Sequence, residues 1–285
     1  MNHESLCAVV GNPIQHSLSP QIHQAFAKAL AIPLRYERFL STASDFQQTV
    51  MHFFAQGGRG LNITVPFKEQ AFQMAKQYCS TRALMAAAVN TLWYKNGNLH
   101  GCNTDGEGLV YDLKRLNTSP KGKKILLIGA GGAAKGVVIP LLEAGCIRLK
   151  IINRTPERAQ QLVQQIQQHL PQHQAQISAG HLQQTQGEWD IVINATSASL
   201  DKTTPKISPV NYTANALAYD MVYGAQPTPF MQAAKAQGAA IVADGLGMLV
   251  EQAASSFAIW FGQRPPTQAI LKELRIQLQN NAQET

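Results

Sequence analysis

The sequence feature that most limits the possible folds is a glycine-rich turn in the middle of the chain. Residues 124–128 have the character of a strand that is covered on both faces. The turn follows as Gly129-Ala130-Gly131-Gly132-Ala133-Ala134, and a helical pattern continues to about residue 143. Small residues in such a strand–turn–helix allow a tight turn and let the backbone approach a pyrophosphate. We therefore predict a Rossmann-like dinucleotide-binding unit; the alternative is a tight turn without a ligand.

The next predicted strand indicates which dinucleotide would be bound. NAD-binding folds usually place Asp or Glu at the end of this strand, where the carboxylate binds the ribose hydroxyls. Here the strand, residues 149–152, ends in Asn153-Arg154-Thr155, and Arg158 follows about one helical turn later. Two guanidinium groups suit the planar, bidentate binding of a 2′-phosphate. The charges therefore favour NADP over NAD, unless Arg154 and Arg158 are only solvated residues at a helix start.

Short strands and helices alternate along most of the chain, which predicts an α/β fold with parallel sheets. In the first hundred residues we expect strands at 6–10, 36–40 and 61–65, helices at 20–30, 44–55 and 66–77, and a hairpin of residues 89–94 and 99–102 around Asn96-Gly97. Beyond residue 155 we expect helices at 156–169, 229–237, 247–261 and 266–279, and strands at 191–194, 218–221 and 240–243.

The length of 285 residues suits two α/β domains. No strand follows the last two predicted helices, so these helices can return to the first domain. We expect an N-terminal substrate-binding domain of residues 1–105 that is completed by residues 244–285. Residues 106–243 would form the dinucleotide-binding domain, with a cleft between the two.

The formal net charge of +7 does not by itself indicate a nucleic-acid-binding protein. Lys and Arg are scattered, the tightest group being Lys121, Lys123 and Lys124, whereas nucleic-acid binders carry a basic stripe. A basic surface also suits an enzyme with anionic ligands. No apolar run reaches about 18 residues, so we expect no membrane span. The four cysteines form no Cys-x-x-Cys pair, so no metal site is indicated, and we expect the protein in a reducing cytosol. The sequence leaves open whether the protein forms a homodimer.

Three polar clusters in the first domain lie just beyond predicted strands, where open α/β sheets usually bind ligands. They are residues 11–20, residues 62–68 and residues 103–106, the last preceded by Val89-Asn90-Thr91. In the first cluster, Ser17 and Ser19 lead into a helix N-terminus, where hydroxyls beside free amides suit a carboxylate. Ser19 is also explained as a helix cap that needs no ligand, whereas Ser17 is not.

A lysine and an aspartate in the other two clusters are candidates for acid/base chemistry. Lys68 opens a predicted helix, where a cation opposes the helix dipole, and Asp105 lies in a polar, glycine-flanked loop. As a pair they could relay a proton to a substrate hydroxyl. Taken singly, each is better explained as a surface lysine or a turn-forming aspartate, and their spacing does not show that they meet.

The motifs taken together, in this order, resemble those of the shikimate dehydrogenase family, of the bacterial biosynthetic, NADP-dependent type. The resemblance covers nearly the whole chain. It rests on Gly11-Asn12-Pro13 with His16-Ser17 and Ser19-Pro20, residues 62–68, Val89-Asn90-Thr91, Asn103-Thr104-Asp105-Gly106, residues 129–133, Asn153-Arg154-Thr155 with Arg158-Ala159, Asn194-Ala195-Thr196-Ser197, Tyr219-Asp220-Met221, Thr228-Pro229-Phe230 and residues 243–249.

This resemblance implies the reversible reduction of 3-dehydroshikimate to shikimate by NADPH, a step of aromatic amino acid biosynthesis. It implies that Lys68 is the general acid/base and that Asp105 is its partner and contacts the substrate hydroxyl. The implied substrate contacts are Ser17 and Ser19 on the carboxylate, Thr64, Asn90 and Gln252 on ring hydroxyls, and Tyr223, which closes on the substrate. The implied NADP contacts are Gly129, Ala130, Gly131, Gly132 and Ala133 at the pyrophosphate, Asn153, Arg154, Thr155 and Arg158 around the 2′-phosphate, and Met221 and Gly245 along the nicotinamide.

Three positions depart from the usual pattern of the family. Ser199 stands where a glycine is usual, Thr81 where an acidic residue is frequent, and Cys102 where an aspartate is frequent. Two rival functions also stay open. A quinate/shikimate dehydrogenase that uses NAD would fit the same scaffold, although Asn153-Arg154 argues against NAD. A non-catalytic NADP-binding sensor would also fit, but it predicts that the Lys68 and Asp105 pair is lost.

Overall fold

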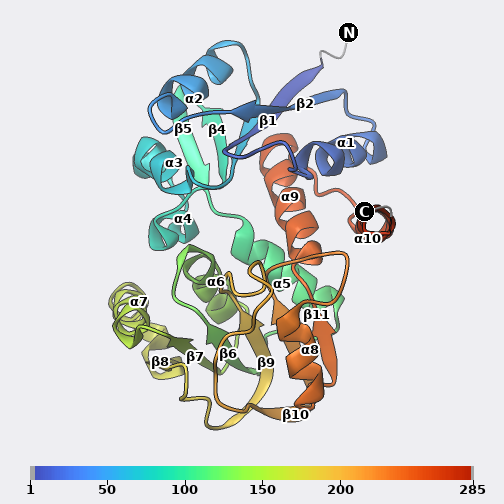
Figure 1. Ribbon diagram of the computed structural model, residues 1–285. Helices are drawn as coiled ribbons and strands as arrows, with labels where there is room; N and C mark the ends of the chain where they lie inside the picture. Colours follow the sequence, from blue (N-terminus) through green and yellow to red (C-terminus); the bar gives the residue numbers. More distant parts are fainter. Residues whose placement is uncertain (1–3, 284–285) are drawn as a thin grey trace. The chain divides into compact units, whose positions relative to one another are not determined.

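The computed structural model describes residues 4–283, and the chain divides into two compact units (Figure 1). The first unit comprises residues 4–108 and 250–271, and the second comprises residues 109–249 and 272–283. The chain passes from one unit to the other within three helices, α5 (Asp105–Arg115), α9 (Leu246–Phe261) and α10 (Gln268–Asn281). The outermost residues of the expected first domain, 1–3 and 284–285, lie outside the described residues.

These bounds differ from the expected domains at the junctions and at the C-terminus. Residues 106–108 fall in the first unit, and residues 244–249 and 272–283 fall in the second. The last of these differences has a clear cause, because Arg275 of α10 pairs with Asp244 and donates a hydrogen bond of 2.7 Å to the carbonyl oxygen of Gly224. The sequence pattern of α10 shows its amphipathic character but not these polar partners.

The first unit contains a mixed five-stranded sheet in the order β2-β1-β3-β4-β5. Its strands are β1 (Ser5–Gly11), β2 (Leu34–Leu40), β3 (Gly60–Ile63), β4 (Thr91–Lys95) and β5 (Asn98–Cys102). Its helices, besides its parts of α5, α9 and α10, are α1 (Ser19–Ala29), α2 (Phe46–Ala55), α3 (Lys68–Ala75), the 3-10 turn η1 (Lys76–Tyr78) and α4 (Thr81–Ala86). Strand β4 runs opposite to the other four strands. It turns into β5 through the predicted two-residue hairpin, in which Asn96 and Gly97 both adopt positive φ.

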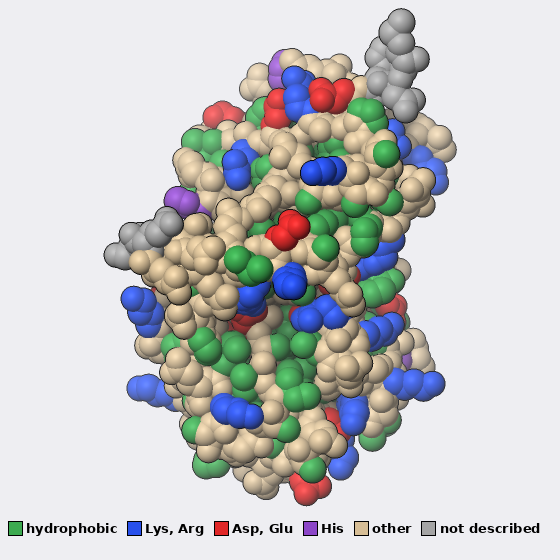
Figure 2. Space-filling view, turned by 90° about the vertical axis from the view of Figure 1, so that its right-hand side faces the viewer, with side chains coloured by type: hydrophobic (Ala, Val, Ile, Leu, Met, Phe, Trp, Pro, Cys, Tyr) green, Lys and Arg blue, Asp and Glu red, His purple; other side chains and the backbone are tan. Residues whose placement is uncertain are grey.

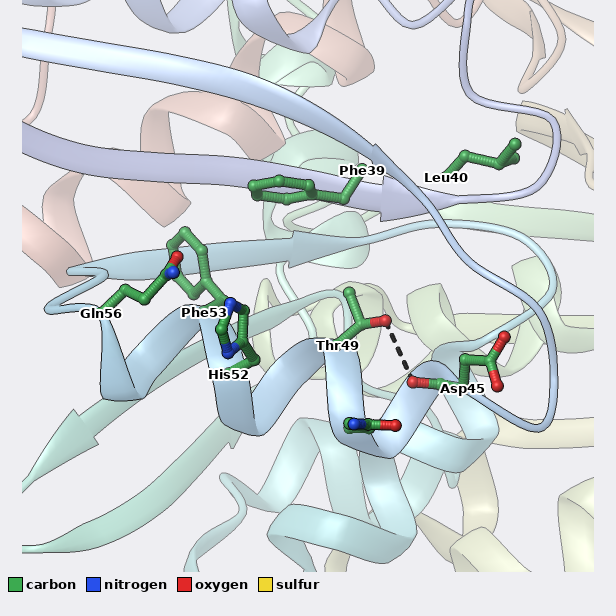
Figure 3. A pocket seen from close by; sticks show the side chains of 8 residues that line it. Phe39, Leu40, Asp45, Thr49, His52, Phe53 and Gln56 are labelled. Carbon is green, nitrogen blue, oxygen red and sulfur yellow. Dashed lines mark hydrogen bonds between the residues drawn. The ribbon is translucent and has the colours of Figure 1, made fainter.

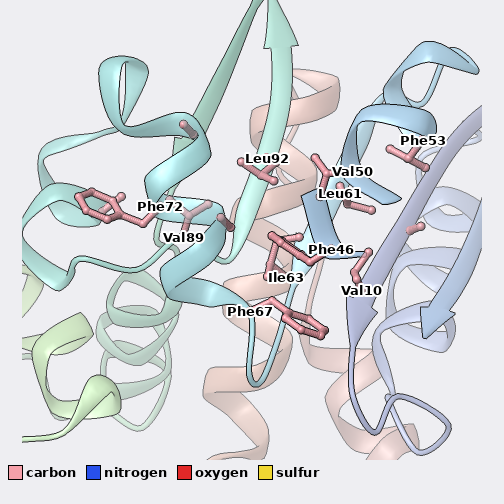
Figure 4. Packing of buried hydrophobic residues seen from close by; sticks show 14 residues of the cluster. Val10, Phe46, Val50, Phe53, Leu61, Ile63, Phe67, Phe72, Val89 and Leu92 are labelled. Atoms are coloured by element: carbon pink, nitrogen blue, oxygen red, sulfur yellow. The ribbon is translucent and has the colours of Figure 1, made fainter. Parts of the chain in front are cut away.

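Alternating side chains of β1 enter two different cores. Ala8 and Val10 pack with Phe46, Val50 and Phe67 in a cluster beneath α2 and α3 (Figure 4). Cys7 and Val9 point to the other face and pack with Trp260 of α9. This period-two pattern is the expected behaviour of a strand that is covered on both faces. Helices on both faces leave the edge formed by the strand ends free to carry functional groups.

The second unit is built on a six-stranded, all-parallel sheet in the order β11-β10-β9-β6-β7-β8. Its strands are β6 (Lys124–Ile128), β7 (Arg148–Asn153), β8 (Ile177–His181), β9 (Glu188–Asn194), β10 (Asn211–Asp220) and β11 (Ile241–Ala243). Its own helices are α6 (Gly132–Glu143), α7 (Pro156–His169), the 3-10 turn η2 (Pro171–Gln176) and α8 (Pro229–Ala236).

In chain order this sheet reads third, second, first, fourth, fifth, sixth strand from β8 to β11, which is the doubly wound dinucleotide-binding topology. The direction of winding reverses between β6 and β9. Ligands of such sheets bind outside the carboxyl ends of the strands at this point. The glycine turn predicted from the sequence follows β6 directly and therefore lies at this position.

Several local predictions were incomplete or wrong. Asp105 is not in a loop but is the first residue of α5, a helix that the sequence analysis missed along with α4 and β8. Strand β10 also begins seven residues earlier than residue 218, because a register shift between Tyr212 and Leu217 breaks its pattern. The remaining predicted strands and helices are present, with ends that differ by a few residues.

Positive charge is dispersed on the face of the molecule that Figure 2 shows. On the face shown in Figure 2, Lys and Arg side chains lie singly or in small groups among polar and apolar atoms, and they form no continuous stripe. Among the described residues, no helix is long and apolar enough to span a bilayer.

Candidate active site

The predicted residues of the first unit gather at one edge of its sheet. Strands β1, β3 and β5 run in one direction, so the segments after their carboxyl ends share an edge. Antiparallel β4 begins at that same edge, which brings Asn90, the residue before it, to the same place. Two backbone contacts tie neighbouring segments together: Asn12 N–H donates to Val65 O at 3.0 Å, and Val89 N–H donates to Lys68 O at 2.9 Å.

Lys68 and Asp105 form a direct ion pair at this edge. Lys68 Nζ lies 2.5 Å from Asp105 Oδ2, and the two side chains are 29% and 20% exposed. Each is the first residue of its helix, Lys68 of α3 and Asp105 of α5. The α5 dipole favours the Asp105 carboxylate, whereas the α3 dipole disfavours the Lys68 ammonium, so the carboxylate supplies the compensating charge. The structure therefore brings together the two residues whose meeting the sequence spacing left open.

Asn90 fixes the orientation of Asp105. Its buried side-chain amide donates to Asp105 Oδ1 at 2.8 Å, so both carboxylate oxygens have a donor. Its Oδ1 accepts the backbone N–H of Thr104 at 2.9 Å. Gln252 of α9 joins the same group, since its Oε1 lies 3.3 Å from both Asn90 Nδ2 and Thr104 Oγ1. Lys68, Asn90, Asp105 and Gln252 thus form one connected polar cluster.

Three hydroxyls join this cluster. Thr91 and Thr104 stood in the predicted motifs without a role of their own, and Ser256 was not singled out from the sequence. Ser256 Oγ lies 2.7 Å from Thr91 Oγ1 and 3.2 Å from Thr104 Oγ1, and it accepts a hydrogen bond of 3.1 Å from Asn62 Nδ2. Ser256 is one helical turn after Gln252, so both face the same way from α9. The spacing of four residues from Gln252 was a usable signal for Ser256, which lies outside the predicted motifs.

Ser17, Ser19 and Thr64 lie in the segments after β1 and β3. The prediction that Ser19 caps α1 is wrong: Ser19 is the first residue of the helix, and the N-cap is Leu18, whose side chain makes no capping hydrogen bond. Instead, Ser17 Oγ accepts the backbone N–H of Ser19 at 3.3 Å, so Ser17 has the local structural role that the sequence did not suggest. The carbonyl oxygen of Ser17 accepts two hydrogen bonds from the Arg38 guanidinium, from Nε at 3.2 Å and from Nη2 at 2.7 Å.

The glycine turn of the second unit has the backbone shape that an anion site needs. Gly129 has a φ of +112° and lies so close to the segment after β9 that a Cβ would be 3.2 Å from Ala195 O. Gly131 is the N-cap of α6, and apart from the adjoining backbone no atom lies within 4 Å of where a Cβ would be at Gly131 or Gly132. Gly131, Gly132 and Ala133 are exposed, whereas Gly129 and Ala130 are buried. The α6 N-terminus is therefore open to an anionic group.

The segment between β7 and α7 carries two exposed guanidinium groups. Arg154 and Arg158 are both exposed, and neither forms an ion pair with any part of the chain that the structure describes. Asn153 Nδ2 donates to Thr155 O at 2.8 Å, which fixes the turn between the strand and the helix. Gly129 N–H donates to Ile152 O at 2.8 Å, so this segment lies beside the glycine turn.

Met221, Tyr223 and Gly245 lie after the last two strands of the same sheet. Gly245 leaves no room for a side chain, because a Cβ there would overlap the carbonyl of Met221. Gly245 N–H donates to Val222 O at 3.1 Å. Tyr223 is partly buried, and burial, aided by the negative charge of Asp244, raises the pKa of its phenol.

Two of the three departures from the family pattern have a structural explanation. Ser199 Oγ donates to Asp220 Oδ2 at 2.6 Å, and Thr228 Oγ1 donates to the same oxygen at 2.6 Å. Burial raises the pKa of Asp220, and these hydroxyls oppose that shift. Cys102 Sγ accepts a hydrogen bond of 3.3 Å from Ser80 Oγ, and burial raises the pKa of its thiol. Nothing in the structure explains Thr81, which is an exposed residue at the start of α4.

A hollow of about 460 Å³ between β2 and α2 is separate from these residues. Its lining includes Phe39, Leu40, His52 and Phe53, and Figure 3 shows Thr49 there with its hydroxyl bonded to the carbonyl oxygen of Asp45. None of the predicted site residues lines it. No group of three or more His, Cys, Asp or Glu side chains that could hold a metal ion occurs in residues 4–283.

Comparison with known proteins identifies the family. Residues 9–92 match the shikimate dehydrogenase substrate binding domain, residues 113–206 match the shikimate/quinate 5-dehydrogenase family, and residues 245–275 match the shikimate 5'-dehydrogenase C-terminal domain. The chain is 54% identical over 271 residues to shikimate dehydrogenase (NADP(+)) of Bordetella avium, with 95% of each chain covered.

Solved structures agree with this result. An Ael1 enzyme from Pseudomonas putida is 40% identical, with a TM-score of 0.88 and coverage of 95% of this chain and 98% of that chain. Shikimate 5-dehydrogenase from Thermus thermophilus, in complex with NADP(H) and shikimate, is 31% identical, with a TM-score of 0.80 and coverage of 94% and 97%. The sheet order of the second unit is consistent with these matches. The family models and the 54% identity to a curated relative show that the chain belongs to the shikimate dehydrogenase family.

Proposed function

We propose that this protein interconverts shikimate and 3-dehydroshikimate with NADP as the redox cofactor. The observation that carries the proposal is the Lys68–Asp105 pair, in which Nζ and Oδ2 are 2.5 Å apart. An alcohol can be oxidised only if its hydroxyl proton is removed as the carbon–hydrogen bond breaks, so the site needs a base next to that hydroxyl. The non-catalytic sensor has no need of such a pair.

The proton would move between the substrate hydroxyl and Lys68. In the direction of oxidation, neutral Lys68 accepts the proton at Nζ, and in the direction of reduction the ammonium returns it. Asp105 stabilises the ammonium form and holds Nζ in place, while Asn90 fixes the carboxylate through its bond of 2.8 Å to Oδ1. The buried hydroxyls of Thr91, Thr104 and Ser256 in turn hold the Asn90 side chain and its surroundings.

The other polar groups of the first unit would bind and orient the substrate. Ser17 and Ser19 would bind the substrate carboxylate, because their hydroxyls lie at the start of α1, where the helix dipole favours an anion. Thr64, Asn90 and Gln252 would hydrogen-bond the ring hydroxyls. Tyr223, which belongs to the second unit, is proposed as a further substrate contact. The first unit is thus proposed as the substrate-binding domain.

The second unit fits a dinucleotide. Its open glycine turn leaves space for a pyrophosphate at the α6 N-terminus, and Gly129, Ala130, Gly131, Gly132 and Ala133 would hold it. Asn153, Arg154, Thr155 and Arg158 would surround the 2′-phosphate, and Met221 and Gly245 would lie along the nicotinamide. When bound, NADP⁺ supplies the hydride acceptor.

The preference for NADP follows from charge. The segment after β7 offers Arg154 and Arg158 and contains no carboxylate before Glu157. A 2′-phosphate would gain two charged donors there, whereas NAD would lack the carboxylate that usually binds its ribose. The proposed location of the protein is the cytosol, because its four cysteines are free thiols. Whether two chains form a homodimer would be tested by light scattering.

The test is a nicotinamide absorbance assay with purified protein. We expect rapid reduction of NADP⁺ by shikimate, slow reduction of NAD⁺, and slow reaction with quinate, which carries an additional ring hydroxyl. Equal use of NAD⁺ or of quinate would overturn the specificity argument and favour the quinate/shikimate dehydrogenase. No reduction with any combination would overturn the catalytic proposal and favour a sensor.

A further inference from the structure

The segment that carries Ser17 and Ser19, the proposed carboxylate site, is hydrogen-bonded to one exposed, charged side chain. Arg38, on β2, donates two hydrogen bonds from its guanidinium to the carbonyl oxygen of Ser17, at 3.2 Å from Nε and 2.7 Å from Nη2. The two residues are 21 positions apart in sequence, and Arg38 is exposed. The contact therefore joins an edge strand of the sheet to the segment that leads into α1.

This contact fixes the backbone conformation of the segment that carries Ser17 and Ser19. Ser17 N–H donates to Ile14 O at 3.1 Å, and Ser17 Oγ accepts the N–H of Ser19 at 3.3 Å. Arg38 takes up the remaining backbone group of Ser17. With its carbonyl fixed by two donors, the peptide plane between Ser17 and Leu18 cannot rotate freely, and the start of α1 keeps its direction. A second role follows from the charge that Arg38 brings there.

The positive charge of Arg38 is not cancelled by a carboxylate. Its neighbour Glu37 points to the other side of the strand and pairs instead with Arg35, with Nε and Oε1 3.3 Å apart. Arg38 itself forms no ion pair within the described part of the chain. A cation beside a helix N-terminus that also offers hydroxyls increases the attraction for an anion.

We propose that Arg38 is a positioning residue for the carboxylate end of the substrate, acting through the Ser17 carbonyl and through its own charge. This inference rests on the proposed function and extends it to a residue outside the family motifs given above. Arg38 would affect how tightly the anionic substrate binds, but not the proton transfer at Lys68. Its effect should therefore appear in KM and Kd for shikimate and not in kcat.

The test compares Arg38→Gln, Arg38→Lys and the matched control Arg35→Gln. The control removes the same charge from the same strand but on the other face. Arg38→Gln should raise KM for shikimate about tenfold, which corresponds to about 1.4 kcal/mol, with kcat and KM for NADP⁺ little changed. Arg38→Lys keeps the charge but loses the pair of hydrogen bonds to the Ser17 carbonyl oxygen, so it should raise KM for shikimate by a smaller factor than Arg38→Gln does. Arg35→Gln should behave as the wild type.

Two further measurements separate this role from a merely structural one. With shikimate methyl ester, which has no carboxylate charge, the effect of Arg38→Gln should be smaller than with shikimate, because only the contribution through the Ser17 carbonyl remains. Raising the ionic strength should weaken shikimate binding to the wild type more than to Arg38→Gln. An equal loss for the acid and the ester would assign Arg38 to the fold alone and overturn the proposal.

Calorimetric titration of shikimate distinguishes failure of this inference from failure of the proposed function. If the wild type oxidises shikimate but Arg38→Gln binds it as tightly as the wild type, the inference is wrong and the function stands. If the wild type does not oxidise shikimate but binds it more tightly than Arg38→Gln does, the positioning role stands and the catalytic proposal is wrong. If the wild type does not bind shikimate, both are wrong.

Discussion

Replacement of Arg154 by glutamine should selectively weaken the use of NADP. Arg154 follows β7 directly, is exposed and has no ion-pair partner in residues 4–283, so its guanidinium is available to a ligand. NADP and NAD differ only by the 2′-phosphate. An interaction with that phosphate therefore changes the binding of one cofactor and leaves the other unaffected.

The size of the effect follows from the exposure of the side chain. A hydrogen bond to a charged group contributes about 1.5–3 kcal/mol, and water around an exposed guanidinium places Arg154 at the lower end. A loss of about 1.4 kcal/mol corresponds to a tenfold weaker affinity. Arg154→Gln should thus raise KM for NADP⁺ about tenfold. Adding Arg158→Gln should increase the loss further, although two groups that share one phosphate are not expected to act additively.

The assay measures kcat/KM for NADP⁺ and for NAD⁺ with shikimate held at saturation. The matched control is Lys121→Gln, which removes one positive charge before β6, at the opposite end of that strand from the glycine turn. The control should change neither cofactor. The reasoning would be refuted if Arg154→Gln lowered the use of NADP⁺ and NAD⁺ equally, or if it left KM for NADP⁺ unchanged.

Three further predictions concern stability and are measured by urea unfolding. Gly247→Ala should lower the free energy of unfolding by about 1–3 kcal/mol, because its Cβ would overlap the fully buried carboxylate of Asp112; an unchanged midpoint would contradict this. Ser199→Ala should destabilise by about 1.5–3 kcal/mol through loss of the bond to Asp220, and more at neutral than at acid pH, because only the carboxylate needs that donor. Burial among aromatic rings lowers the pKa of His23 from 6.5 to about 3, and the nearby amide of Asn62 opposes this shift only in part. The unfolded state therefore binds a proton at a higher pH than the folded state does. The free energy of unfolding should fall as the pH drops below about 6.5. His23→Phe should flatten that dependence between these pKa values, and an unchanged slope would contradict the assignment.

The parts of the fold that were predictable depend on local patterns. The glycine turn after β6 and the Asn96-Gly97 hairpin have short-range signals, since positive φ at Gly129, Asn96 and Gly97 is a property of the residues themselves. The parts that were missed depend on distant partners. Strand β8 pairs only with β7 at the sheet edge, and α10 groups with the second unit through Arg275, which binds residues 31 and 51 positions away.

The candidate site shows the same division. Residue types marked Lys68 and Asp105 as chemically capable, but only the arrangement of β3, β4 and β5 shows that they meet. Asp105 was expected in a polar, glycine-flanked loop, yet α5 begins at Asp105 and contains Gly106 and Gly108. Tertiary contacts outweigh the low helix propensity of glycine there.

The central claim is that Lys68 transfers the proton, and the most direct measurement is the turnover of Lys68→Met with shikimate and NADP⁺. Its control is Lys76→Met, an exposed lysine in the 3-10 turn that follows the same helix. We predict that kcat of Lys68→Met falls by about 10²–10⁴-fold, while the Kd for shikimate stays within a few-fold and the control retains wild-type turnover. Turnover of Lys68→Met close to that of the wild type would contradict the account.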